Sequence, residues 1–161
     1  MAGGVFRVAH RDDFTAVLGL YRQLAPDDPV LTDGSDRAAF EQIMNAPGLR
    51  LFVLELDDRV VATTYLNVIP NITRSASPYA VVENVVVLDS VRGRGLGKQI
   101  MAGTLQAAWD AGCYKVMLMT SSKNPYVHGF YASCGFSATT KTGYVVVRSG
   151  DGSPVRGGAT A

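Results

Sequence analysis

The chain has 161 residues, of which 47% are hydrophobic, so it can bury one sizeable core and is expected to form one domain over residues 1–148. Its formal net charge of +1 at pH 7 creates no overall field that would draw it to nucleic acid or to an anionic membrane. No apolar run approaches the roughly 20 residues that cross a bilayer, so we expect neither a nucleic-acid nor a membrane partner.

The two cysteines, Cys113 and Cys134, follow no segment that resembles a secretory signal. Thiols that stay reduced are typical of proteins in the reducing cytosol. We therefore expect a cytoplasmic protein without a disulfide framework.

Apolar periodicity and turn residues predict the elements of the first half of the chain. The first strand alternates over Val5–Val8, and Asp12 or Asp13 can cap the helix that follows it. A second helix begins at 33–35 and ends at Pro47-Gly48. Segments 49–56 and 60–68 are joined by a short turn and predict an antiparallel hairpin.

The second half begins with a surface loop at 71–78, rich in serine, threonine and proline. Its expected elements are a strand at 79–88, a helix from Leu96 to Gly112, a strand at 115–120, a short helix capped by Asn124, closing strands at 136–140 and 143–148, and a flexible tail at 149–161. A strand, helix, strand sequence implies a right-handed parallel crossover. The strands at 79–88 and 115–120 should therefore be parallel.

A glycine-rich turn with three cations lies between the strand at 79–88 and the helix that follows. It consists of Arg92, Gly93, Arg94, Gly95, Leu96, Gly97 and Lys98. Backbone amides at a helix start lack intrahelical partners, and the helix dipole adds partial positive charge there. Glycines let that backbone approach a ligand closely, so the segment predicts a phosphate site.

Two familiar nucleotide loops do not fit this segment. A dinucleotide fingerprint would need a glycine where Lys98 stands. A Walker A loop would need a glycine at Arg92 and a serine or threonine at Gln99. An R/Q-x-x-G-x-G/A pattern does fit, with Arg92, Gly95 and Gly97.

That pattern resembles the acyl-CoA pyrophosphate loop of the GNAT family of N-acetyltransferases. A second stretch is similar to another GNAT signature: Asn124 is followed seven residues later by Tyr131 and then by Gly135-Phe136. The two motifs together cover about a third of the chain, from Tyr79 to Phe136.

The resemblance implies a single-domain α/β (α+β) fold, with a mixed, mostly antiparallel sheet and helices on both faces. Its central parallel strands would splay apart to hold acetyl-CoA, the acetyl donor, and no metal would be required. The residues that would bind this cofactor are Val85, Val86, Val87, Arg92, Gly93, Arg94, Gly95, Leu96, Gly97, Lys98, Asn124 and Tyr131.

The family reaction is direct attack of a primary amine on the thioester in a ternary complex. Backbone amides near Val86 and Val87 would stabilise the oxyanion, and Tyr131 would be the general acid for the thiolate. Glu83 is our candidate base, because strand alternation places it on the face of Val85 and Val87. Burial among apolar neighbours would favour its neutral form.

Each of these residues has a structural alternative. Glu83 can be a salt-bridged strand carboxylate, Tyr131 a packed aromatic residue, and Asn124 a helix cap. His128 and Cys134 suggest a nucleophilic pair, but six residues on a helix place their side chains about 240° apart, so we expect them to be unrelated.

The identity of the acceptor stays open among small amines, aminoglycoside-type amines and peptide amines. The oligomeric state also stays open, with a homodimer as one possibility. Glu83 to Val87 with the glycine loop is similar to the glucosamine 6-phosphate N-acetyltransferase branch. The chain departs from it at Asn84, where that branch has an acid, and shows no clear second basic cluster for a sugar phosphate. The rival hypotheses are an acyl-CoA-binding regulatory module without activity and a nucleotide-binding protein.

Overall fold

A computed structural model describes residues 4–148 and 154–155, which form two compact units that meet in sequence at Lys123 and Asn124. The predicted domain extent of 1–148 stays a prediction. The predicted flexible tail at 149–161 lies outside the described residues except for Pro154–Val155. Within the described part of the chain, no helix is long and apolar enough to span a membrane.

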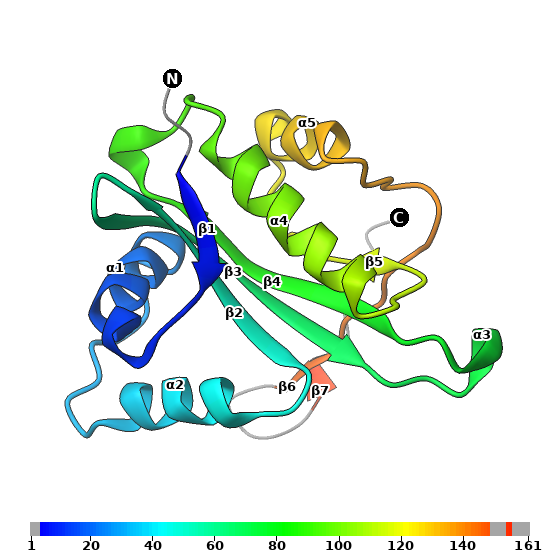
Figure 1. Cartoon of the computed structure of the whole chain (residues 1–161), viewed down its shortest axis with the longest axis horizontal. Helices are drawn as coiled ribbons and strands as arrows, with labels where there is room; N and C mark the ends of the chain where they lie inside the picture. The colour runs from blue at the N-terminus through cyan, green and yellow to red at the C-terminus, as the bar shows by residue number, and fades with distance from the viewer. Residues whose placement is uncertain (1–3, 149–153, 156–161) are drawn as a thin grey trace. The chain divides into compact units, whose positions relative to one another are not determined.

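The first unit is built on a five-stranded sheet with the order β1-β2-β3-β4-β5 (Figure 1). The strands are β1 (Val5–Val8), β2 (Leu49–Leu56), β3 (Arg59–Ile69), β4 (Tyr79–Val87) and β5 (Val116–Met117). All neighbouring strands are antiparallel except β4 and β5, which are parallel. This pattern confirms the mixed sheet that the sequence predicts.

The helices of this unit are α1 (Phe14–Leu24), α2 (Ser35–Asn45), the single turn α3 (Thr73–Ala76) and α4 (Leu96–Asp110). Short 3-10 turns occupy Arg11–Asp13 and Asp89–Val91. Asp13 stands at the start of α1, but its carboxylate binds Arg7 and the His10 amide instead of capping the helix. Asp13 therefore occupies the predicted N-cap position without the expected side-chain capping bond, and the helix is confirmed.

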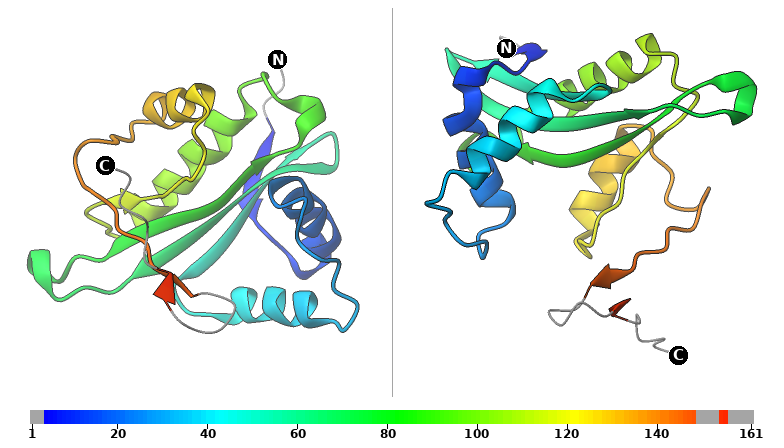
Figure 2. Two further views of the ribbon diagram at one scale, coloured as in Figure 1. Left: turned by 180° about the vertical axis from the view of Figure 1, so that it is seen from behind. Right: turned by 90° about the horizontal axis from the view of Figure 1, so that it is seen from below.

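Different helices pack against the two faces of the sheet (Figure 2). Thr64 on β3 makes a buried 2.6 Å hydrogen bond to Thr104 of α4. Val53 on β2 packs with Val17 of α1 and Phe40 of α2. Adjacent strand residues point to opposite faces, and Val53 lies opposite Thr63. The sheet therefore separates α4 from α1 and α2.

The second unit contains α5 (Pro125–Ser133) and a small hairpin of β6 (Val147–Arg148) and β7 (Pro154–Val155). The predicted strands at 136–140 and 143–148 are wrong, apart from the two residues of β6. Tyr144, Val145 and Val146 have a strand-like composition but are exposed. A strand also needs a neighbour for its backbone groups, which composition does not supply.

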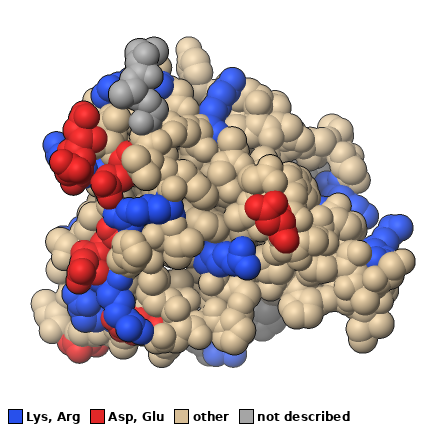
Figure 3. All heavy atoms as spheres, viewed as in Figure 1, with Lys and Arg blue, Asp and Glu red and all other residues tan. Residues whose placement is uncertain are grey.

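Charges of both signs are spread over the face seen in Figure 3, with wide neutral areas between them. This distribution agrees with the near-zero net charge of the chain. No single basic area dominates that face, so anion binding must depend on local groups.

Candidate functional site

The two parallel strands separate soon after they pair. Ala80 lies opposite Val116 and Val81 opposite Met117, and the described pairing of β4 with β5 ends there. Residues 82–87 continue as strand against β3 alone. Among the described residues, one edge of β4 beyond Val81 thus has no strand partner, which agrees with the opening that the family resemblance implies.

A bulge interrupts β4 beside this opening. Tyr65 lies opposite Glu83, whereas Thr63 lies opposite Val86, so β4 has one more residue than β3 between these pairs. Asn84 lies within the extra length and has a left-handed φ of 51°. Asparagine tolerates this conformation better than most residues.

The bulge changes which side chains share a face. Opposed residues of an antiparallel pair point the same way, so Glu83 shares a face with Val86. Val87 lies opposite Ala62 and packs on the α4 side. The predicted common face of Glu83 and Val87 is therefore wrong. Glu83 is also exposed, so the burial expected from its apolar neighbours is absent.

The backbone of Val87 points toward the open edge. Leu88 donates its N–H to Val61 on β3, and strand backbone groups alternate in direction. Val87 must then direct its N–H and carbonyl away from β3. That carbonyl accepts a 3.1 Å hydrogen bond from Arg92 Nε, and Arg92 also pairs with Asp89 at 2.5 Å. Arg92 therefore braces the strand end.

The glycine loop ends on the first turn of α4. Gly93 and Gly95 have φ values of 78° and 81°, and a Cβ at either would meet no atom within 4 Å. The first backbone bond of α4 runs from Gln99 N to Gly95 O, which leaves the amides of Leu96, Gly97 and Lys98 ahead of the intrahelical ladder. Leu96 is buried and anchors the turn.

Two cations flank these amides. Arg94 and Lys98 are exposed, and neither takes part in an ion pair among residues 4–148. The first turn of α4 thus combines amide donors, a helix dipole and two positive side chains, which is a suitable arrangement for a diphosphate.

The second unit presents the other motif on α5. Asn124 caps this helix by accepting a 3.0 Å hydrogen bond from the Tyr126 amide, so the predicted cap is confirmed. Tyr131 is partly buried and contacts Phe130 and Phe136, with ring centroids 5.1 Å and 6.1 Å away. The packed aromatic role is therefore present, and the acid role stays a prediction.

A basic–aromatic cluster of Arg74, Tyr79, Tyr114 and Lys115 lies where β4 and β5 begin. Lys115 Nζ is 5.1 Å and 5.5 Å from the ring centres of Tyr79 and Tyr114, and Arg74 Cζ is 5.9 Å from that of Tyr114. Within the described ranges, neither cation pairs with a carboxylate.

This cluster was missed in the sequence because Arg74 comes from the β3–β4 connection, Tyr79 from the start of β4, and Tyr114 and Lys115 from the α4–β5 connection. Only the paired start of β4 and β5 brings those two segments together. Tyr79 and Glu83 share a face of β4, since they lie opposite Ile69 and Tyr65, and four strand residues separate them by about 13 Å.

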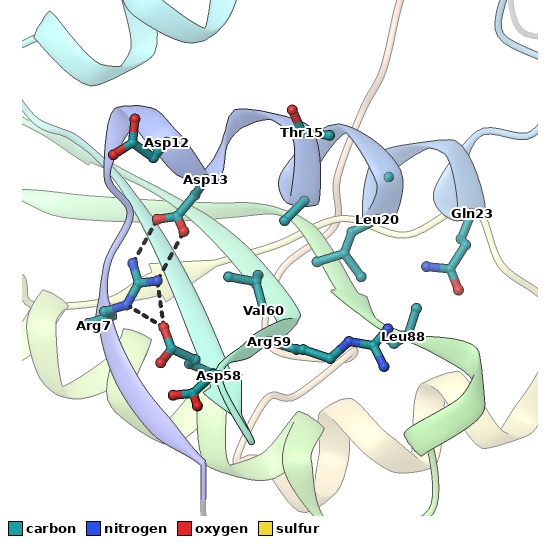
Figure 4. Close-up of a pocket in the computed structure, with 13 residues that line it drawn as sticks. Arg7, Asp12, Asp13, Thr15, Leu20, Gln23, Asp58, Arg59, Val60 and Leu88 are labelled. Atoms are coloured by element: carbon teal, nitrogen blue, oxygen red, sulfur yellow. Dashed lines mark hydrogen bonds and ion pairs between the residues drawn. The ribbon is translucent and has the colours of Figure 1, made fainter.

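A cavity of about 520 Å³ lies along α1 (Figure 4). Arg7 lines it and binds Asp13 at 2.7 Å and Glu55 at 2.7 Å. None of the predicted catalytic or cofactor residues lines this cavity. It reaches Leu88 and Gln23, and Gln23 Oε1 accepts a 3.0 Å hydrogen bond from the Asp89 amide. The cavity therefore extends to the start of the segment that connects β4 to α4.

No group of three or more histidine, cysteine, aspartate or glutamate side chains that could hold a metal ion occurs in the part of the chain that the structure describes. The expected absence of a metal requirement stays a prediction.

The family model described as the acetyltransferase (GNAT) family matches residues 16–136. This chain belongs to the GNAT family. It is an N-acetyltransferase, and acetyl-CoA is the donor that the family uses.

Two curated relatives are N-acetyltransferases with amino-sugar acceptors in their names. Glucosamine 6-phosphate N-acetyltransferase 1 of rice is 38% identical over 74% of this chain and 72% of its own length. Aminoglycoside N(6')-acetyltransferase type 1 of Salmonella typhimurium is 29% identical over 76% and 84%.

Solved structures support the same fold. A putative acetyltransferase from Agrobacterium tumefaciens has a TM-score of 0.84 at 43% identity, over 89% of this chain and 99% of its own. An aminoglycoside N-acetyltransferase in complex with CoA has a TM-score of 0.74 at 24% identity, over 92% and 98%. The second likeness shows the fold alone.

The ion pair in the cavity predicts an acid-sensitive contribution to stability. The Arg7 guanidinium, opposed by burial, holds the pKa of Asp13 below its ordinary value. The contribution is then complete above the unfolded pKa of about 3.9 and is lost as pH falls through the folded value. Asp13→Asn should lower the free energy of unfolding by about 1–3 kcal/mol at pH 7, and by less below pH 4, in urea titrations.

Asp58→Asn is the control for this prediction. Asp58 lines the same cavity and takes part in no ion pair among the described residues. The control should match the parent across the pH range. A constant gap between the parent and Asp13→Asn from pH 7 to pH 3 would contradict the assignment.

Proposed function

We propose that acetyl-CoA lies along the open edge of β4, with its pyrophosphate on the amides of Leu96, Gly97 and Lys98. The support is the unpaired strand edge, the left-handed glycines with open space above them, and the free first turn of α4. Arg94 and Lys98 add charge to the same turn. Arg92 acts indirectly, because its guanidinium already binds Val87 and Asp89.

In the proposed reaction, Glu83 takes a proton from the acceptor ammonium, directly or through a water molecule. The amine nitrogen then bonds to the thioester carbon, and the Val87 N–H donates to the resulting oxyanion. When the carbon–sulfur bond breaks, Tyr131 gives its proton to the leaving thiolate. The nitrogen, which became positively charged on attack, loses its second proton to the tyrosinate of Tyr131, and the proton held by Glu83 passes to solvent, which returns both side chains to their starting states.

We further propose that the acceptor is an amino sugar phosphate, with glucosamine 6-phosphate as the compound to test. The observation that carries this proposal is the basic–aromatic cluster, whose two cations lack carboxylate partners among the described residues. Tyr79 of the cluster shares a face with Glu83 at about 13 Å. A phosphate on the cluster would direct the rest of the sugar toward the bulge.

The aminoglycoside relatives suggest a different amine acceptor. Aminoglycosides carry several positive charges, which the cations of the cluster would repel. The charge of this cluster therefore favours the phosphorylated amino sugar.

The loop assignment predicts a selective loss of cofactor binding. Gly95→Ala should lower the free energy of unfolding by about 1–2 kcal/mol, because its φ of 81° is left-handed, and should also weaken CoA binding measured by calorimetric titration. Gly112→Ala is the matched control, since Gly112 ends the same helix at φ 77° with open space around it. Gly112→Ala should lower the free energy of unfolding by a similar amount and leave the affinity for CoA unchanged. Equal CoA affinity in both variants would remove the loop from the site.

The catalytic assignments predict losses of turnover. Glu83→Gln should lower kcat about 100-fold and flatten the acidic limb of the rate–pH profile, since general bases contribute that much or more. Tyr131→Phe should lower kcat with little change in acetyl-CoA affinity. A thiol-release assay measures both, and an unchanged kcat would assign the role to another group.

The acceptor assignment predicts a dependence on the phosphate. Glucosamine 6-phosphate should be acetylated with a higher kcat/KM than glucosamine or an aminoglycoside. Combined Arg74→Ala and Lys115→Ala should raise its KM about tenfold, because charged hydrogen bonds are lost, and should change the KM for glucosamine little. The exposed Lys123→Ala serves as a control. Equal rates with glucosamine and its phosphate would refute the phosphorylated acceptor.

A further inference from the structure

Tyr21 places a buried hydroxyl between α1 and the sheet. The ring is partly buried and packs against the cluster that contains Val17 and Val53. Its hydroxyl is shielded from solvent and has no hydrogen-bond partner among the described residues. A buried polar group without a partner is costly, so its retention calls for an explanation.

The surroundings of this hydroxyl lead to the β4 bulge. Burial raises the pKa of Tyr21 to about 12, and the nearby side chains of Asn84 and Thr63 oppose that rise, although neither has hydrogen-bond geometry here. Thr63 already donates its hydroxyl proton to the Phe52 carbonyl at 2.9 Å. Thr63 can then only accept a hydrogen bond from Tyr21, whereas the side-chain amide of Asn84 can either accept or donate one.

Asn84 holds the left-handed position of the bulge, between Glu83 and Val85. A change in the backbone conformation of Asn84 would reorient the Glu83 carboxylate on one side and the backbone from Val85 to Val87 on the other. Hydrogen bonds that serve catalysis are often long in the free enzyme and shorten only in the complex. Tyr21 and Asn84 fit this pattern, since Asn84 influences the Tyr21 hydroxyl but makes no hydrogen bond to it in the free protein.

We propose that Tyr21 is a positioning residue for acetyl transfer, whose hydroxyl bonds to the side-chain amide of Asn84 when the open edge of β4 is occupied. The bond holds the bulge in the conformation that presents Glu83 and the Val87 N–H to the reacting groups. This inference rests on the proposed placement of the reaction at the bulge. It is independent of which amine is the acceptor.

The first test is Tyr21→Phe, which removes the hydroxyl and keeps the ring. The free protein should unfold at the same denaturant concentration or a higher one, because no hydrogen bond is lost there. The kcat should fall about five- to tenfold with acetyl-CoA affinity within twofold of the parent. Tyr144→Phe, which removes an exposed hydroxyl, is the control and should change neither quantity.

The second test is a double-mutant cycle with Asn84→Gly, since glycine keeps the left-handed φ and removes the amide. If Tyr21 acts through Asn84, the double variant should turn over no more slowly than Asn84→Gly alone. Losses that multiply, an unchanged kcat in Tyr21→Phe, or a large loss of stability with a proportionate loss of activity would each overturn the proposal.

These assays use whichever amine the acceptor panel shows to be turned over. Failure of glucosamine 6-phosphate as a substrate would therefore refute the acceptor proposal and leave the Tyr21 test intact. If Glu83→Gln is fully active while Tyr21→Phe is impaired, the placement of the base fails and the role of the bulge stands.

Discussion

The early end of pairing between β4 and β5 is the constraint on which the rest of this site depends. A strand edge that loses its neighbour must satisfy its amides and carbonyls with other partners. Here Arg92 donates a hydrogen bond to the Val87 carbonyl, and the N–H of Val87 faces the opening. An extended ligand can occupy such an edge as an added strand would. The same geometry thus supplies a binding surface and an amide donor.

The elements around this opening are held by interactions that leave the edge itself accessible. The buried Thr64–Thr104 hydrogen bond and the anchor of Leu96 fix α4 to one face of the sheet. Across the sheet, α1 packs Tyr21 against the cluster of Val17 and Val53, with Asn84 of the bulge acting on its hydroxyl, and Gln23 accepts a hydrogen bond from the amide of Asp89. The phosphate loop and the proposed base are therefore supported from opposite faces.

Local patterns predicted most elements because their signals are short-range. The turn at Asp57-Asp58 has two left-handed residues, as a tight hairpin requires, and Asn124 caps α5 as its sequence context predicts. The bulge at Asn84 could not be predicted, since an extra residue is visible only against the partner strand. The predicted closing strands were wrong for a similar reason. Tyr144 to Val146 have the composition of a strand, but they have no partner strand in the described structure.

The sequence by itself determined the glycine loop, the second motif and the family, because these depend on residue types at fixed short spacings. Tertiary structure decided which face Glu83 occupies, which backbone group meets the open edge, and that Arg74 and Lys115 form one basic–aromatic cluster. These properties depend on register and on contacts between distant segments. A linear pattern does not encode them, since one inserted residue reverses the direction of every side chain beyond it.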